Sequence, residues 1–399
     1  MAAPPQVDCN ADRPSLYVAF ELGNSKWKLA LTVGLGQKPR LRDINAGNVV
    51  SLLKEIERAK KRFKLPPDAP VRSCYEAGRD GFWLHRYLKN QGIDNMIVDS
   101  ASIEVNRRKR RAKNDRLDAQ KLVTMLQRYY LGEVKVWSIV EVPKVEQEDE
   151  RQLDRELMAL KSERTKHINR IKGLLAGWGI RIKSVGKDFS RQVEKLRLWW
   201  DDSRDPLGSE LPVRLRQRLL RELERMELLE RQIKEVTQER AERIGQCPTA
   251  QSEQMRKLLG LRGIGAGTAS VYVTEFFGWR QFKNRRQVAS LAGLTPTPYD
   301  SGNADREQGI SKAGNRRIRT FAVESAWSWL RFQPQSELSG WYHRRFGSGN
   351  KRQRRIGIVA MARKLLIQLF QYLETGVPPA GAVMSPWQSK VPRSAIRES

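Results

Sequence analysis

The stretch LYVAFELGNSKWKLALTV, residues 16–33, decides the fold class of the first part of the chain. Residues 16–20 form a short apolar run that ends at Glu21, and residues 23–25, Gly-Asn-Ser, are typical of a tight turn. Residues 27–33 are again mostly apolar and predict a return strand. The pattern indicates two neighbouring strands, with an acidic residue at the end of the first.

Further strands and helices alternate downstream of this stretch. Apolar residues at strand or helix spacing predict strands over 71–75 and 96–98, and helices over 49–63, 82–90 and 118–130. Strands that alternate with helices predict an α/β layer fold, here for residues 15–142.

The middle of the chain, residues 143–250, has a different pattern. Apolar residues recur there mostly at steps of three or four, between Glu and Arg side chains, over 153–175 and again over 219–236. This spacing predicts two long helices that form an antiparallel or an intermolecular coiled coil. A solvated helical hairpin without a dimerisation role is the alternative.

The last part of the chain is again helical in pattern. Residues 251–376 show helical spacing with glycine-rich turns between the helices. Residues 377–399 are rich in Pro, Ser and Arg, which predicts a disordered tail. The predicted fold class of the whole chain is therefore α/β plus all-α.

The charge balance indicates a polyanionic partner. The 399 residues include 74 Lys+Arg against 45 Asp+Glu, a formal net charge of +29. We expect no membrane span and no signal peptide, so nucleic acid is the first candidate partner. A basic surface without a partner is the alternative.

Cysteine and histidine are too sparse to build a site of their own. The three cysteines and three histidines are scattered along the chain. Their spacing argues against a zinc site, a disulfide framework and a histidine-based catalytic site. A reducing cytoplasm is the expected location.

Four acidic residues have settings that suit metal-dependent phosphoryl transfer. Glu21 and Glu76 each follow a predicted strand, and Asp115 and Asp118 lie on one face at the start of a predicted helix. Carboxylates that converge on two Mg²⁺ ions are the usual group for this reaction. Each also has a structural interpretation: Glu21 can end a turn, and Asp115 can cap the helix.

A run of cations lies immediately before Asp115. Charge runs are usually solvated, but this one adjoins the predicted metal site, where phosphate must arrive, so we predict that it grips the phosphate backbone. The run comprises Arg107, Arg108, Lys109, Arg110, Arg111 and Lys113.

A glycine turn within residues 258–269 joins two helical patterns and resembles a helix-hairpin-helix element. Such a turn exposes backbone N–H groups that favour phosphate, so Arg262, Gly263 and Gly265 are candidate nucleic-acid-binding residues. Any tight turn between helices also favours glycine, so the motif has a structural interpretation as well.

Ser301 precedes a glycine in a polar loop, a setting in which a nucleophile can be exposed. Chemistry alone does not select it, because loop serines are common and no histidine is near in sequence to act as a base. Four cations follow it and are predicted to bind the scissile phosphate: Lys312, Arg316, Arg317 and Arg319.

Four motifs, in this order, resemble the insertion-sequence 110/1111 family of DEDD transposases, the bridge-RNA-guided recombinases. They are Glu-Ala-Gly-Arg-Asp-Gly from Glu76, Asn-Asp-Arg-Leu-Asp-Ala around Asp115, Gly-Ile-Gly from Gly263, and Asp-Ser-Gly at Ser301 followed by Gly-Ile-Ser-Lys-Ala-Gly-Asn-Arg. The resemblance covers residues 17–376.

The resemblance implies a three-part architecture for the chain. It implies an N-terminal RuvC-like, RNase H-like domain over 15–142, a coiled-coil linker over 143–250 and a helical C-terminal transposase domain over 251–376. The last of these would contain the helix-hairpin-helix-like element.

The resemblance also implies roles for individual residues. Glu21, Glu76, Asp115 and Asp118 would bind Mg²⁺, and Ser301 would attack DNA and form a transient phosphoserine link. The first acidic position is usually Asp in the family and is Glu21 here. Glutamate is one methylene longer and still offers oxygen ligands.

The implied partners are the DNA of element ends and target, a structured guide RNA from the element, and further copies of the chain in a dimer or tetramer. The implied location is the bacterial cytoplasm. Two other functions are compatible with the residues: a nuclease that uses only the carboxylates, and a catalytically inactive nucleic-acid-binding relic. They differ in whether Ser301 or metal is needed.

Overall fold

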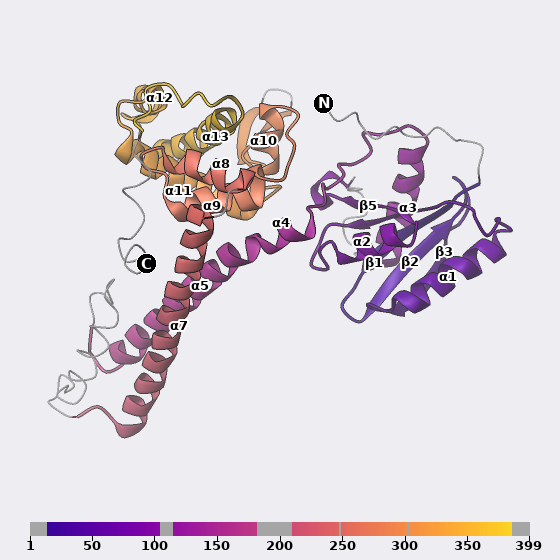
Figure 1. Ribbon diagram of the computed structural model, residues 1–399, viewed down its shortest axis with the longest axis horizontal. Coiled ribbons are helices and arrows are strands. Elements are labelled where there is room, and N and C mark those ends of the chain that lie inside the picture. The colour runs from indigo at the N-terminus through magenta and orange to yellow at the C-terminus, as the bar shows by residue number, and fades with distance from the viewer. Residues whose placement is uncertain (1–13, 104–114, 182–209, 247–248, 302–303, 385–399) are drawn as a thin grey trace. The chain divides into compact units, whose positions relative to one another are not determined.

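The structure, a computed structural model, describes residues 14–103, 115–181, 210–246, 249–301 and 304–384 (Figure 1). The chain divides into two compact units, Met1–Val142 and Pro143–Ser399. Each unit has its own hydrophobic cores. The predicted run of cations over 107–113 lies outside the described residues.

The first unit is built on a five-stranded sheet in the order β3-β2-β1-β4-β5. The strands β1 (Leu16–Leu22), β2 (Lys26–Thr32) and β3 (Arg40–Asn45) are antiparallel neighbours, whereas β4 (Val71–Glu76) and β5 (Asp94–Val98) continue the sheet in parallel with β1. This mixed sheet confirms the α/β class for the first unit and is compatible with an RNase H-like domain.

Helices cover both faces of this sheet (Figure 1). The helices α1 (Val49–Arg62) and α2 (Trp83–Asn90) pack on one face, over Phe20, Leu29 and Tyr75. The helix α3 (Asp115–Tyr130) packs on the other face, over smaller side chains such as Ala19 and Cys74. The alternation of side chains along each strand therefore builds two separate cores.

The strand β3 and its place in the sheet did not follow from the sequence pattern. Ile44 is its single buried side chain, and apart from Leu41 the other residues of the strand are polar or charged. Because β3 is an edge strand, only a small part of it faces the core, and polar side chains are usual at such an edge.

The second unit begins with a long helical hairpin. After α4 (Val145–Asp149), the helices α5 (Arg151–Ala176) and α7 (Val213–Gln246) pack against each other. Residues near the start of α5 meet residues late in α7, and residues near its end meet residues early in α7, so the two run antiparallel. Of the two predicted arrangements, the described chain shows the antiparallel one within a single molecule.

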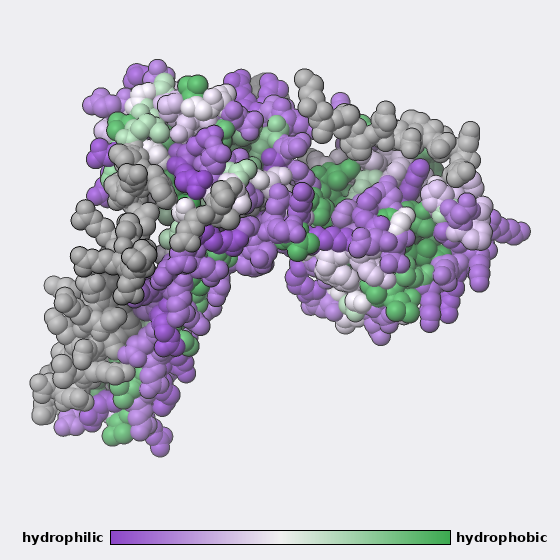
Figure 2. Space-filling view, viewed as in Figure 1, coloured by the Kyte–Doolittle hydropathy of each residue, from purple (hydrophilic) through white to green (hydrophobic). Residues whose placement is uncertain are grey.

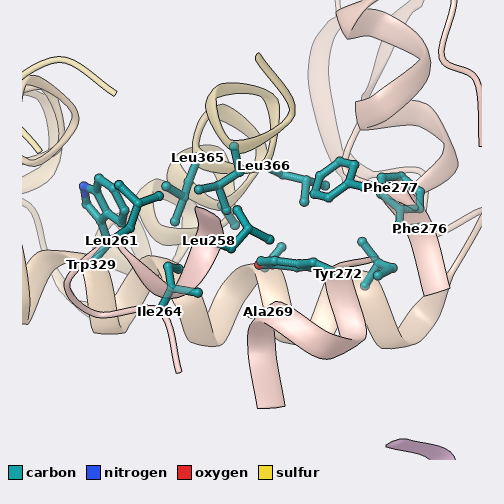
Figure 3. Packing of buried hydrophobic residues seen from close by; sticks show 14 of the residues in the cluster. Leu258, Leu261, Ile264, Ala269, Tyr272, Phe276, Phe277, Trp329, Leu365 and Leu366 are labelled. Carbon is teal, nitrogen blue, oxygen red and sulfur yellow. The ribbon is translucent and has the colours of Figure 1, made fainter. Parts of the chain in front are cut away.

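The rest of the second unit is a helical domain with one small sheet. Its elements are α8 (Ala250–Leu259), α9 (Ala266–Tyr272), the π-helix η3 (Val273–Phe277), α10 (Arg285–Leu291), β6 (Pro296–Ser301), β7 (Ala304–Ile310), α11 (Arg316–Phe332), α12 (Glu337–Phe346) and α13 (Lys351–Thr375). Leu258, Leu261 and Ile264 around the glycine turn pack with Trp329 of α11 and with α13 (Figure 3). The antiparallel pair β6–β7 is a departure from the helical prediction.

Part of the predicted tail is ordered. Met384 forms a β-bridge with Leu261, and the backbone N–H of Arg262 donates to the carbonyl of Val383 at 3.1 Å. The prediction of disorder from residue 377 is therefore wrong for residues 377–384, because the Ser and Arg residues on which it rests all lie within 385–399.

One described helix, α13, is long and apolar enough to cross a membrane by length and composition. Half of its apolar stretch is buried inside the unit, including Met361, Leu365 and Leu369. Such burial is usual for the central helix of a folded domain, which passes the same length and composition test.

The contact between α3 and the sheet gives a stability prediction. Leu122 is 2% exposed and packs into the core under α3, whereas Leu117 on the same helix is 43% exposed. We expect Leu122→Ala to lower the stability of the first unit by about 2–5 kcal/mol, because it leaves a cavity. Hydrogen exchange of the sheet amides in the full chain measures this loss. Leu117→Ala is the matched control and should change stability by about 0.5 kcal/mol or less; equal effects of the two changes would contradict this packing.

Candidate active site

Two of the predicted carboxylates lie side by side at the ends of neighbouring strands. The register of β1 and β4 pairs Ala19 with Cys74 and Phe20 with Tyr75. The same offset brings Glu21 opposite Glu76, one residue further along both strands. Because the two strands are parallel, both carboxylates lie at the same edge of the sheet.

Both side chains also belong to the same face of the sheet. Ala19 and Cys74 are buried under α3, and successive residues of a strand alternate between faces. Glu21 and Glu76 stand two residues further on and therefore share the α3 face. Glu21 is half-buried and Glu76 is exposed.

The direction of α3 brings a third carboxylate to this edge. Tyr130 at the end of α3 contacts Tyr17 and Arg72, which lie near the starts of β1 and β4. Leu122, in the middle of α3, accepts a weak hydrogen bond from the Cys74 thiol at 3.9 Å. The helix therefore runs antiparallel to these strands, and its first turn lies toward their carboxyl ends.

Asp118 belongs to the stripe of α3 that faces the sheet. It lies one turn before Leu122 and next to Ala119, both of which are buried against the sheet. Asp118 itself is half-buried. Asp115 is the first residue of α3, and its side chain lies outside the described part of the structure.

The donor set fits a hard divalent cation, because it consists of carboxylate oxygens at one edge of a sheet. Within the described ranges no three His, Cys, Asp or Glu side chains are close enough together to hold a metal ion. The arrangement thus brings Glu21, Glu76 and Asp118 toward one edge, while the four-residue metal site stays a prediction.

The predicted nucleophile lies at the end of a strand. Ser301 is the last residue of β6 and pairs with Ala304 of β7. The sequence analysis placed Ser301 in a loop, whereas the described backbone is a strand up to this residue.

The base of this hairpin is held by two glycines and an arginine. Gly293 and Gly314 have φ values of +67° and +102°, and a Cβ at either would lie 2.2 Å from a carbonyl oxygen. The Arg319 guanidinium donates to the carbonyls of Lys312 at 3.0 Å and Ala292 at 3.3 Å. Arg319, predicted to bind phosphate, thus holds two backbone segments together.

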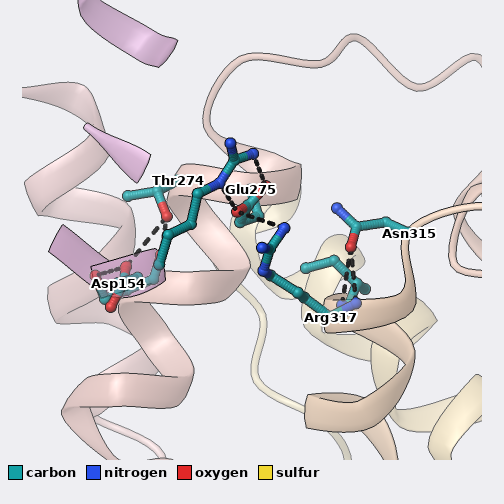
Figure 4. A network of polar contacts seen from close by, with 8 residues as sticks. Asp154, Thr274, Glu275, Asn315 and Arg317 are labelled. Carbon is teal, nitrogen blue, oxygen red and sulfur yellow. Dashed lines mark hydrogen bonds and ion pairs between the residues drawn. The ribbon is translucent and has the colours of Figure 1, made fainter. Parts of the chain in front are cut away.

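A second predicted phosphate ligand, Arg317, faces a buried carboxylate (Figure 4). Its guanidinium lies 3.8 Å from Glu275, which is 2% exposed and sits in the π-helix. Arg155 of α5 donates to both oxygens of Glu275, at 2.7 and 3.1 Å. Although burial raises it, these hydrogen bonds and charges hold the pKa of Glu275 below its ordinary value.

Asp154 is a second buried carboxylate in this region (Figure 4). It accepts hydrogen bonds from Ser270 at 2.6 Å and from Thr274 and Arg240 at 3.3 Å each. Burial raises the pKa of Asp154, which these partners only partly offset. The two carboxylates join α5 and α7 to the domain that holds the hairpin, and the sequence analysis did not single them out.

Three of the four predicted cations are exposed, Arg317 among them. Lys312 and Arg316 point into solvent, and neither has an ion pair among the described residues. Asn315 between them caps α11 by accepting from the backbone N–H groups of Arg317 and Ile318. These two cations keep the predicted capacity to meet a phosphate near the hairpin.

The glycine turn has a structural explanation in the described chain. Gly263 has a φ of +95°, and its carbonyl accepts from Ser328 at 2.7 Å. The Arg262 carbonyl accepts from the buried amide of Gln333 at 2.8 Å. Arg262 itself is exposed, as is Gly265, which is the N-cap residue of the short helix α9. A phosphate-binding role for this turn stays a prediction.

The buried pair around Glu275 gives a pH-dependent prediction. We expect Glu275→Gln to lower the free energy of unfolding by about 3 kcal/mol at pH 7, because it leaves the partly buried Arg155 guanidinium without its carboxylate partner. The ionised form stabilises the fold above the ordinary glutamate pKa of about 4.3, and this contribution is lost as the pH falls through the lower pKa of the folded protein. The difference from wild type should therefore shrink below about pH 4.3.

Denaturant unfolding across pH measures this difference. Glu253→Gln is the matched control, because Glu253 forms an exposed pair with Lys257 at 3.5 Å and such pairs contribute about 0–1 kcal/mol. A constant gap between wild type and Glu275→Gln down to pH 3 would contradict the assignment.

Comparisons with known proteins place these features in a family. Residues 255–343 match the family model described as Transposase IS116/IS110/IS902 family, a range that includes the glycine turn and the β6–β7 hairpin. The y4rJ protein of Sinorhizobium fredii, which is named as a transposase, is 41% identical over 385 residues, covering 94% of this chain and 95% of that protein.

Two named insertion-element transposases match shorter parts of the chain. The transposase for insertion sequence element IS1111A of Coxiella burnetii is 30% identical over 221 residues, 55% of each chain. That for IS1328 of Yersinia enterocolitica is 30% identical over 162 residues, 40% of this chain and 46% of its own length. This chain therefore belongs to the IS110 family of insertion-element transposases.

Proposed function

We propose that this transposase cuts and rejoins DNA with a divalent-metal site made by Glu21, Glu76, Asp115 and Asp118 and with Ser301 as the nucleophile. The observation that supports this most is the register of β1 and β4, which brings Glu21 and Glu76 together at one edge and on the face covered by α3. If Glu21 and Glu76 only ended their strands, they would not need to point to the same face of the sheet.

Mg²⁺ is the proposed metal, with two ions as in other sites of this chemistry. When bound, it would neutralise the charge that develops on the phosphate during strand cleavage. The role of this chain is to supply oxygen ligands from two strand ends and from the first turn of α3. Glu21 occupies a position that is usually Asp in the family, and it offers the same ligand atoms.

The serine step balances without a further reactant. The Ser301 Oγ attacks the phosphorus, a serine–phosphorus bond forms, and the bond from phosphorus to one deoxyribose oxygen breaks. The serine proton ends on the released DNA hydroxyl. Attack by the hydroxyl of a new partner strand reverses the step and frees the serine. Because the phosphodiester bond energy is conserved, the reaction needs no nucleotide cofactor.

The proposed partners are DNA, as element ends and target, and a structured guide RNA. The net charge of +29 suits such polyanions. Guidance by RNA rests on the family resemblance alone. It would leave sequence choice to base pairing while the protein holds backbone and shape. The predicted run of cations over 107–113 and the exposed Lys312 and Arg316 are the proposed contacts.

We also propose that the working form is a dimer or tetramer. The carboxylates belong to the first compact unit and Ser301 to the second. An oligomer would allow the serine of one copy to act with the carboxylates of another.

Excision of the element tests whether Ser301 and the carboxylates are both needed. With the gene and its native flanks on a plasmid in a bacterial host, amplification across the excised circular junction should give a product for wild type. We expect at least a hundredfold loss in Ser301→Ala and in Asp118→Ala, because each removes a group that the reaction uses. Glu57→Ala, on the exposed face of α1, and Ser348→Ala are the controls. A junction that persists in Ser301→Ala would leave a metal-only nuclease as the better description.

Complementation between two variants tests whether the serine and the carboxylates of different subunits act together. Co-expression of Ser301→Ala with Asp115→Ala should restore junction formation if the serine and the carboxylates act in different copies. Each variant expressed alone provides the baseline. Absence of rescue, with both proteins shown to be present and folded, would contradict a shared site and leave the chemistry of each copy intact.

A further inference from the structure

The second compact unit contains a large open groove. It has a volume of about 1580 Å³ and lies between α10, the base of the β6–β7 hairpin, α12 and α13. Sites for small molecules have volumes of about 300–1,000 Å³. The size of this groove therefore fits a segment of a macromolecule better than a metabolite.

One wall of the groove is a row of cations along α13. Arg352, Arg355 and Arg363 all line the groove. Their spacing places them on one stripe of the helix. The distance along the helix from Arg352 to Arg363 is roughly 16 Å, at about 1.5 Å per residue. A row of this length can meet several successive phosphates of one nucleic-acid strand.

The other walls carry the same charge. Arg285 and Arg286 of α10 and Arg344 and Arg345 of α12 line the groove from other sides, and Lys312 lies at its edge. The one acidic lining residue is Glu337. The face over α12 and α13 mixes hydrophilic and apolar patches in Figure 2.

These cations have no carboxylate partners in the described part of the chain. Every ion pair of this unit lies elsewhere, as in the pairs of Arg155 with Glu275 and Arg240 with Asp154. Exposed cations that face one another repel, and an anionic ligand relieves this repulsion. The groove is therefore suited to a polyanion and not to another neutral surface.

The aromatic side chains in the groove are already engaged. The Lys364 ammonium lies 4.8 Å from the centre of the Trp341 ring. The Phe346 and Trp341 rings pack edge to face, with their centres 5.7 Å apart. Proteins that bind single strands offer free aromatic rings on which bases stack. The lining of this groove instead offers guanidinium groups to phosphates. The aliphatic parts of these arginine side chains can lie over apolar lining residues such as Ile356.

We propose that this groove binds the sugar–phosphate backbone of double-stranded DNA, independently of base sequence. The inference rests on the proposed function in taking DNA as the substrate. It does not depend on the carboxylates or on Ser301. Of the groove cations, Lys312 alone was among the residues that the sequence analysis predicted to bind nucleic acid.

The test is a binding measurement on the full chain, with a chelator present so that strand cleavage plays no part. The probe is a fluorescent DNA duplex of arbitrary sequence, titrated at several salt concentrations. We expect the triple variant Arg352→Gln/Arg355→Gln/Arg363→Gln to bind at least tenfold more weakly. The slope of log affinity against log salt should fall by about two to three units, since each phosphate contact contributes about 0.9.

A charge-matched variant separates this groove from general basicity. Arg218, Arg221 and Arg231 are exposed on α7, and their triple change to Gln removes the same charge. This control should retain at least a third of the wild-type affinity. Thermal unfolding of both variants checks that the fold is retained.

The outcomes distinguish the possible ligands. A larger loss for duplex DNA than for single-stranded DNA or an RNA duplex supports the proposal. Equal loss in the groove variant and the α7 control would overturn it, as would a loss confined to RNA or to single strands. Unchanged DNA binding would also overturn it and would favour an acidic protein segment. Because no chemistry is measured, a failed excision assay would leave this result standing.

Discussion

The close packing of α3 on the small side chains of the sheet is the contact on which the candidate site depends. Ala19, Ala30 and Cys74 are fully buried there and leave room for the helix to approach the strands. Larger residues such as Phe20 and Tyr75 point to the opposite face, on which α1 and α2 pack. The helix must run antiparallel to β1 and β4 for its aromatic end to meet Tyr17 and Arg72. Its acidic first turn is thereby directed to the strand ends that carry Glu21 and Glu76.

The second unit uses buried charge for a similar purpose. Asp154 and Glu275 are each almost fully buried, and each is compensated by an arginine from a long helix or by hydroxyl groups. A buried ion pair contributes little net stability, but removing one partner is costly, so such pairs specify one arrangement. Here they define how the helices α5 and α7 meet the π-helix. Arg317, near the start of α11, also forms an ion pair with Glu275 and so joins this helix to the same network.

Arginines in this unit thus have two distinct uses. Arg155, Arg240 and Arg319 are bound to carboxylates or carbonyls inside the molecule. The cations that line the large groove have no such partners among the described residues. A net charge of +29 does not by itself distinguish the two classes, because it counts both equally. The distinction matters for function, since only the second class can meet phosphate without breaking the fold.

The sequence by itself determined the family, the α/β character of the first unit and the two long helices of the second. These follow from local patterns: apolar runs of strand length, helical spacing, and short motifs around Glu76, Asp115 and Ser301. It did not predict β3 or the β6–β7 pair, because an edge strand and a short hairpin of mostly polar residues contain few apolar side chains at strand spacing.

Only the tertiary structure decided which residues, distant in the sequence, lie close together. The parallel register brings Glu21 beside Glu76, although 54 other positions lie between them in the chain. It also separates Arg319, which holds backbone carbonyls, from the neighbouring exposed Arg316, and it gathers cations from α10, α12 and α13 around one groove. Local spacing carries no information about such meetings, because they depend on strand register and helix direction over long separations.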